Sequence, residues 1–261
     1  MEGYWTGIAA QATVDWCEPN YVYSPWVAEW WNTLTSLVIA LGGLVGAGWS
    51  WRSKTRVELR FVAAFLSLAL VGLGSAAFHG TLLRWAQAVD ELPMMLSSMV
   101  FIYILRFRRD GDDMFGRGAD QRARRGWILG LTAYAAGYVA AYFLFADLFV
   151  FFVGTYALSV VWISVQTYRL AFGAEGSPVL RRLFFCSIGA YVGGFVVLWI
   201  PEHVLLGCAH PLQHAQLHAL FHLTSALGTY AWVLMALIDR HRGFGAKLTF
   251  SRPVPMFLEA A

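Results

Sequence analysis

Seven apolar stretches, each long enough to cross a membrane, restrict the possible folds of this chain more than any other feature. A spanning α-helix needs roughly 17–25 residues. The stretches lie at about 30–51, 60–83, 89–107, 126–145, 147–169, 182–206 and 214–238. The chain is 58% hydrophobic and only 13% charged, whereas about 25% of the residues of a soluble domain are charged. We therefore predict an all-α, polytopic membrane protein built as a seven-transmembrane-helix bundle.

The distribution of Lys and Arg orients this bundle. All of these residues except Arg84 can be assigned to the loops that follow the first, third and fifth stretches, edges of the stretches included, or to the C-terminal tail. An excess of Lys and Arg is typical of cytosolic loops. We therefore expect a cytosolic C-terminus and an N-terminus that is lumenal or outside. The basic residues are spread over separate short loops, so the net charge of +3 does not indicate nucleic-acid binding.

The chain is expected to form one membrane domain over residues 1–261. We divide it into a lumenal acidic segment, the bundle and a cytosolic tail, at residues 1–29, 30–238 and 239–261. The N-terminal segment does not resemble a cleavable signal peptide, because it lacks a basic start and carries Asp15 and Glu18. Cys17 and Cys208 would share an oxidising compartment, which favours a disulfide over two free thiols.

Five polar side chains lie in the apolar stretches, where ionisable groups are costly and usually functional. Ser75 and His79 come at the end of the second stretch, and Asp90 comes at the start of the third. His218 and His222 lie near the start of the seventh. With the orientation given above, all five reach a similar depth in the outer half of the bundle.

The spacing of these residues indicates a metal centre. Ser75 and His79 share one helix face, as do His218 and His222, because each pair is four residues apart. Three imidazoles can hold zinc and leave one position open for water, which the metal then activates as a nucleophile. Asp90 would transfer protons, and Ser75 would support an oxyanion or orient a histidine. The pattern predicts an intramembrane metallohydrolase.

Each residue also has an ordinary structural explanation. A lone histidine in an apolar helix is more often a hydrogen-bonded structural residue. Asp90 can cap the third helix, with Pro93 in its first turn, and Ser75 can bond to a carbonyl. His214 extends the row of histidines, so the pair could instead be His214 and His218. We prefer a shared site because the residues lie at matched depth.

A second group of oxygen donors precedes the first stretch. Calcium takes six to eight oxygen ligands, and the donors here are Asp15, the Trp16 carbonyl, Glu18, Asn20 and Glu29. Their spacing is not that of an EF-hand, and from spacing alone a solvated acidic loop is the simpler explanation. Glu29 favours a cation site, because an unpaired carboxylate at the membrane entrance is costly.

The sequence resembles the alkaline ceramidases over most of its length, from about Tyr4 to Arg240. The matching strings are E-G-Y-W near the N-terminus, D-W-C-E-x-N at 15–20, A-E-W-W-N-T at 28–33, G-S-A-A-F-H at 74–79, D-E-L-P-M at 90–94 and H-A-L-F-H-L-T-S-A-L-G-T-Y at 218–230. Residues 107–126 and the tail after Lys247 match poorly. The serine, aspartate and histidines are common to a wider superfamily of seven-span hydrolases, so D-W-C-E-x-N is the more discriminating string.

The resemblance implies an amidohydrolase that cleaves ceramide into a sphingoid base and a fatty acid. It implies zinc on His79, His218 and His222, with Asp90 in proton transfer and Ser75 in transition-state support. It also implies a regulatory calcium on Asp15, Trp16, Glu18, Asn20 and Glu29, and a lumenal bridge between Cys17 and Cys208. The ceramide would enter from the bilayer. We expect the protein in the membrane of the endoplasmic reticulum or Golgi, with the active site toward the lumenal half.

Two other functions share this pattern of residues. One is a seven-span receptor of the progestin and adipoQ type, in which zinc is structural. The other is a hydrolase that remodels the lipid of GPI anchors. The D-W-C-E-x-N string and the short N-terminal segment argue against the receptor. A transporter is disfavoured, because no pair of broken helices is evident in the sequence.

Overall fold

The computed structural model describes residues 3–7, 9–52, 57–112, 116–145, 148–206, 208, 215–245, 248–250 and 258–260. Among them, seven helical spans are long and apolar enough to cross a membrane. The first five are α1 (Trp30–Arg52), α2 (Leu59–Thr81), α3 (Arg84–Arg106), α4 (Gln121–Leu144) and α5 (Leu148–Phe172). The sixth span consists of α6 (Pro178–Gly194) and two π-helical segments, η1 (Phe195–Trp199) and η2 (Pro201–Leu206), and the seventh is α7 (Leu217–Gly243).

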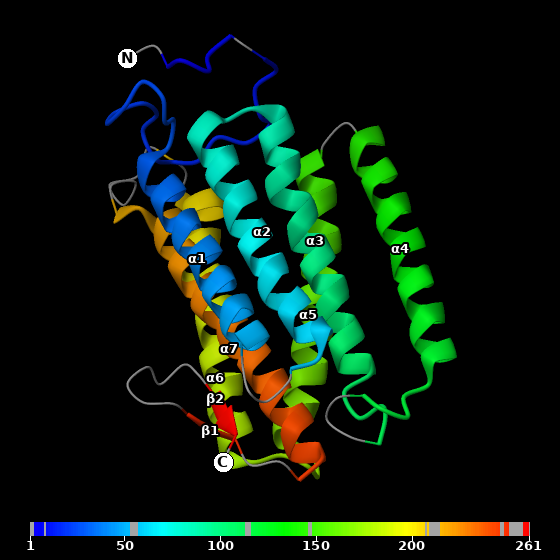
Figure 1. Ribbon diagram of the computed structural model, residues 1–261. Coiled ribbons are helices and arrows are strands. Elements are labelled where there is room, and N and C mark those ends of the chain that lie inside the picture. The colour runs from blue at the N-terminus through cyan, green and yellow to red at the C-terminus, as the bar shows by residue number, and fades with distance from the viewer. Residues whose placement is uncertain are drawn as a thin grey trace.

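The prediction of an all-α, seven-span bundle is therefore confirmed (Figure 1). Two three-residue strands, β1 (Leu248–Phe250) and β2 (Leu258–Ala260), pair in the C-terminal segment. The upper end of the bundle in Figure 1 carries the N-terminal segment, and the lower end carries the C-terminal strands. These two ends are named upper and lower below; which of them faces the cytosol stays a prediction.

The helix boundaries differ from the predicted ones for local reasons. α3 begins at Arg84, five residues early, and Leu83 precedes it as the N-cap. Asp90 therefore lies inside the helix, and the alternative that it caps α3 is wrong. α4 and α6 also begin early, because Asp120 and Ser177 accept hydrogen bonds from backbone N–H groups of their first turns. The predicted break between the fourth and fifth stretches, at residues 146–147, and the predicted start of the seventh stretch, at residue 214, lie outside the described residues.

Close approach of the first three helices depends on small residues. A Cβ atom on Gly72 of α2 would collide with the backbone of Ala40 in α1. One on Gly74 would collide with the carbonyl of Val89 in α3. Small residues permit such backbone contact between membrane helices. Because Gly74 precedes Ser75, this contact also brings the polar end of α2 against α3.

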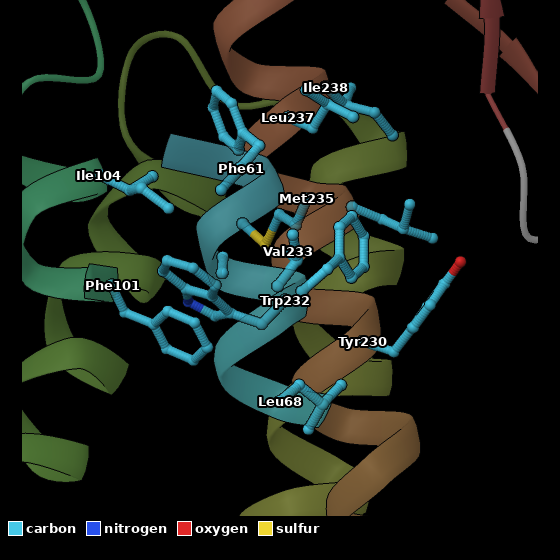
Figure 2. Packing of buried hydrophobic residues seen from close by; sticks show 14 of the residues in the cluster. Phe61, Leu68, Phe101, Ile104, Tyr230, Trp232, Val233, Met235, Leu237 and Ile238 are labelled. Atoms are coloured by element: carbon cyan, nitrogen blue, oxygen red, sulfur yellow. The ribbon is translucent and has the colours of Figure 1, made fainter. Parts of the chain in front are cut away.

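Among the described residues, three buried apolar clusters fill the bundle, and one of them joins α3 to α4 and α5. The lower cluster packs α2, α3 and α7 together through side chains such as Phe61, Phe101 and Met235 (Figure 2). The upper cluster joins the N-terminal segment to the helices, because Trp16 packs there with Trp199. α4 lies at the edge of the bundle in Figure 1, and only its Tyr138 and Tyr142 are buried.

An ionic network closes the lower end of the bundle. Glu58, before α2, accepts hydrogen bonds from Arg60 at 2.7 Å and from Arg240 of α7 at 2.8 Å. Asp239 accepts from Arg108 and Arg109, the loop arginines that follow α3, at 2.9 and 2.8 Å. Buried charges are tolerated only when they are paired in this way. The network therefore fixes the loops to the end of α7.

We expect Glu58→Gln to lower the free energy of unfolding by about 3 kcal/mol or more. The substitution leaves the buried guanidinium groups of Arg60 and Arg240 without their counter-charge. Glu175→Gln is the matched control, since Glu175 also pairs with Arg108 but its side chain is 56% exposed. Exposed pairs contribute at most about 1 kcal/mol. Denaturation of the detergent-purified variants measures both effects, and equal losses would contradict the assignment.

Candidate metal centre and its surroundings

Three buried histidines converge at the upper end of the bundle. Ligand nitrogens of His79, His218 and His222 all lie within 4.8 Å of one another. His79 belongs to the last turn of α2, whereas the other two lie in the first two turns of α7. Of the two pairs that the sequence allowed, His218 and His222 face His79. His214 lies outside the described residues.

The ring nitrogens of these histidines have different partners. Nδ1 of His79 is hydrogen-bonded to Oε2 of Glu29, and Nδ1 of His222 lies 3.0 Å from Oγ1 of Thr35. Nδ1 of His218 is buried without a hydrogen-bond partner. Partners of this kind orient the ring of a metal-binding histidine and leave its other nitrogen for the metal. The donor set of three close imidazoles therefore fits zinc with one open position.

Ser75 and Asp90 adjoin the histidines and contact each other. The Ser75 side chain neighbours the Asp90 carboxylate, and its Oγ accepts a hydrogen bond of 3.0 Å from Oγ of Ser36. Ser36 lies in turn 3.3 Å from Nδ1 of His222. Ser75 and Asp90 also line the same cavity as His218 and His222. The structure thus gathers the five residues of the predicted zinc site in one place.

Glu29 joins the N-terminal segment to the histidines. Its carboxylate accepts hydrogen bonds from the backbone N–H of Trp16 at 3.0 Å and from the side-chain amide of Asn32 at 2.9 Å. Burial raises the pKa of this carboxyl to about 8, in spite of these two bonds. A residue that resemblance assigns to calcium is therefore bonded to His79, a predicted zinc ligand.

The other predicted calcium ligands lie at the start of α1. Glu18 accepts hydrogen bonds from the backbone N–H groups of Trp31 at 2.7 Å and Asn32 at 2.9 Å, where carboxylates stabilise a helix. Asp15 accepts bonds of 3.0 and 3.1 Å from the Asn20 amide. Oδ1 of Asn20 is buried and lacks a hydrogen-bond partner. This amide oxygen is thus free to bind a cation.

A disulfide and a ring stack hold the N-terminal segment in place. Cys17 and Cys208 are bonded, as predicted, and Cys186 is a free, exposed thiol. The bridge connects the N-terminal segment to the connection that follows η2. Beside it, the Trp16 indole stacks on the His218 imidazole with a centroid separation of 3.7 Å. The segment therefore contacts two of the three histidines, through Trp16 and through Glu29.

A hydrogen-bond network beside Asp90 was not predicted. Glu91 is buried and accepts bonds from Gln87 at 2.9 Å and from the Tyr142 hydroxyl at 2.6 Å. Oε1 of Gln87 accepts in turn from the backbone N–H of Thr13 at 2.9 Å. The network thereby attaches the N-terminal segment and α4 to the turn of α3 that carries Asp90. The i, i+4 spacing of Gln87 and Glu91, across the start of the third apolar stretch, was the available indication.

A cavity of about 570 Å³ extends from the histidines into the bundle. Its walls are largely apolar and come from α2, α3, α5, α7 and the sixth span. Asp90 and His218 line its upper part, whereas Trp232 lines its lower part. On α5 and the sixth span, it is lined by Val161 and Val196, whose side chains are 60% and 52% exposed. The cavity therefore reaches the bundle surface between these two spans.

Comparison with known sequences identifies the family. A family model described as Ceramidase matches residues 9–249, which is most of the chain. This chain belongs to the ceramidase family. The ceramidase is 29% identical over 248 residues to alkaline ceramidase 3 of Mus musculus, covering 92% of this chain and 87% of the relative. It is 27% identical to putative alkaline ceramidase dcd3A of Dictyostelium discoideum, covering 93% and 92%.

A third relative is alkaline ceramidase YPC1 of Saccharomyces cerevisiae, with 26% identity over 85% of this chain and 75% of the relative. The resemblance inferred from the sequence strings is therefore confirmed. The family assignment makes the protein a ceramidase, an enzyme that is embedded in the membrane and hydrolyses a lipid substrate. The histidine cluster of this ceramidase is compatible with zinc.

We expect Glu29→Gln to weaken zinc binding by about 10–100-fold, the usual effect of removing the partner that orients a metal-binding histidine. Glu175→Gln is the control, because it removes an exposed carboxylate that pairs with Arg108 at the lower end of the bundle. Competition with a zinc chelator measures the affinity of each purified variant. Wild-type affinity of the Glu29 variant would show that its contact with His79 does not support the metal site.

Proposed function

We propose that this ceramidase hydrolyses the amide bond of ceramides at a zinc site formed by His79, His218 and His222. The convergence of these three buried imidazoles, two of which (His218 and His222) line an apolar cavity, is the observation that carries the proposal. Zinc bound there would supply an activated water and polarise the amide carbonyl. The products are a free fatty acid and a sphingoid base.

The proposal gives Asp90 and Ser75 separate roles in this reaction. Hydrolysis adds the oxygen of water to the acyl carbon and breaks its bond to nitrogen, and the departing amine takes up a proton. The Asp90 carboxylate would receive a proton from water and return it to the nitrogen. The Ser75 hydroxyl, which neighbours Asp90, would donate its single proton to the oxyanion that forms at the carbonyl oxygen.

The cavity suits a lipid that arrives from the bilayer. Its lining is largely apolar, and it reaches the surface between α5 and the sixth span. A ceramide could therefore enter sideways without leaving the hydrocarbon layer. The amide would then lie among the polar groups at the upper end, with hydrocarbon tails against the apolar walls.

A regulatory calcium is proposed on Asp15, the Trp16 carbonyl, Glu18, Asn20 and Glu29. Support comes from the buried Oδ1 of Asn20, which has no hydrogen-bond partner, and from the carboxylates at the start of α1. The ion would hold Glu29, and Glu29 orients His79. Calcium bound there would thus act on the zinc site through one shared side chain.

The upper end of the bundle is proposed to face the lumen of the endoplasmic reticulum or Golgi. The arginines of the described loops gather mostly at the opposite end, which would be cytosolic by the positive-inside rule. The disulfide belongs to the upper end, and such bonds persist in oxidising compartments. The same orientation gives the lumenal segment, bundle and cytosolic tail expected at 1–29, 30–238 and 239–261.

Alanine at His79, His218 or His222 should lower kcat/KM for ceramide at least about 1,000-fold, because metal activation supplies several kcal/mol. Chelation of the wild type should remove activity, and added zinc should restore it. His241→Gln is the control, since His241 is a buried histidine at the other end of α7. Release of free fatty acid measures turnover, and undiminished turnover of the purified alanine variants would refute the zinc mechanism.

The double variant Asp15→Asn with Glu18→Gln should need at least about tenfold more calcium for half-maximal activity, because calcium affinity follows the number of charged ligands. Its zinc content should remain that of the wild type. Glu175→Gln also removes a carboxylate, but at the lower end, and should leave the calcium titration unchanged. A double variant with the wild-type titration would mean that the acidic segment holds no regulatory ion.

A further inference from the structure

We propose that Trp232 and Phe101 form the floor of the ceramidase cavity, and that this floor sets the longest hydrocarbon tail that the enzyme accepts. The inference rests on the proposed function, because it takes the amide to lie at the histidines. It adds a determinant of substrate length at the far end of the same cavity.

The cavity ends at one level on the two helices that carry these residues. Its lining on α7 runs from His218 to Trp232, and its lining on α3 runs from Asp90 to Phe101. Trp232 is ten residues beyond His222, which is about 15 Å along a helix. Between the two ends the walls are mainly apolar. This length of cavity therefore fits an alkyl tail that extends away from the amide.

The floor is held rigidly by contacts between three helices. The Trp232 indole stacks on the Phe101 ring, with centroids 4.3 Å apart and planes 20° from parallel, and Figure 2 shows the two rings face to face. Nε1 of Trp232 donates to Oγ1 of Thr167 on α5 at 2.9 Å. A buried indole N–H requires such a partner. The bond therefore fixes the ring across the end of the cavity.

Beyond the floor, the bundle is filled. Ile104, Leu180 and Met235 are each at most 1% exposed and belong to the lower apolar cluster. Still lower, Glu58 and Arg240 form the buried ionic network. Interiors packed in this way leave no space for additional methylene groups. A tail that reaches Trp232 must therefore stop there or leave its excess length outside the cavity.

Ceramide has two alkyl tails, the acyl chain and the chain of the sphingoid base, and either satisfies the chemistry of the cavity. Two substrate series distinguish them. In one, the acyl length varies on a constant base; in the other, the base length varies under a constant acyl chain. The wild type should have one tail length with the highest kcat/KM. In one of the two series, Trp232→Leu and Trp232→Ala should raise the kcat/KM for longer tails, relative to the kcat/KM for that length, at least about tenfold.

Met235→Ala is the matched control. Met235 lies on the same helix one turn below Trp232 and does not line the cavity, so its substitution removes buried volume outside the cavity. It should keep the wild-type length profile. Phe101→Leu removes the aromatic ring that α3 contributes to the floor, instead of the one that α7 contributes. This variant should produce the same shift as the Trp232 variants, and it tests the floor independently if those variants fold poorly.

A second measurement does not need catalysis. Thermal stabilisation of each purified protein by free fatty acids and by sphingoid bases of increasing length reports which tails bind. The optimum should move to longer tails in the floor variants and stay constant in Met235→Ala. If the wild type hydrolyses no ceramide, the proposed function fails, whereas this binding shift would still support the floor. Unchanged length profiles in folded Trp232 and Phe101 variants would overturn the inference.

Discussion

The requirement that polar groups inside a bilayer have partners determines the organisation of this bundle. A membrane offers no water to satisfy them, and ionisable side chains there are costly. At the lower end, Glu58 and Asp239 are saturated by arginines, so their charges serve only to hold loops and helices together. At the upper end the partners are arranged differently. There, one nitrogen of His79 and one of His222 are bonded, which leaves the opposite nitrogens facing a common point.

This arrangement makes the N-terminal segment part of the site. Glu29 is hydrogen-bonded to His79, and Trp16 stacks on His218. Glu18 accepts hydrogen bonds from backbone N–H groups at the start of α1. The disulfide to Cys208 and the bond from Thr13 to Gln87 attach the same segment at two further points. A change in this segment therefore reaches the histidines through side chains that are already buried and bonded. The calcium regulation proposed above would therefore need no large movement of the helices.

The bundle and the centre of its site could be predicted because their patterns are local. A long apolar stretch specifies a span by itself, and the spacing of His218 and His222 specifies a shared face. The start of α3 was misplaced, because Arg84 lies in the first turn of a helix that the apolar pattern begins only at residue 89. Partners contributed by distant segments, such as Thr35 for His222 and Tyr142 for Glu91, follow from packing between helices and leave no local pattern.

The two ends of the cavity have separable tasks. In the proposed mechanism, polar groups at the upper end would fix the position of the reacting amide, while the stacked pair of aromatic rings about 15 Å away would limit the length of the tail. Trp232 is tied to Thr167 and Phe101, and within the described part of the chain no hydrogen bond or ring contact joins these three residues to the histidines or to Asp90. A substitution at the proposed floor would therefore alter which lipids fit without disturbing the groups proposed to cleave them. Substrate range and reaction chemistry can thus change independently within one bundle.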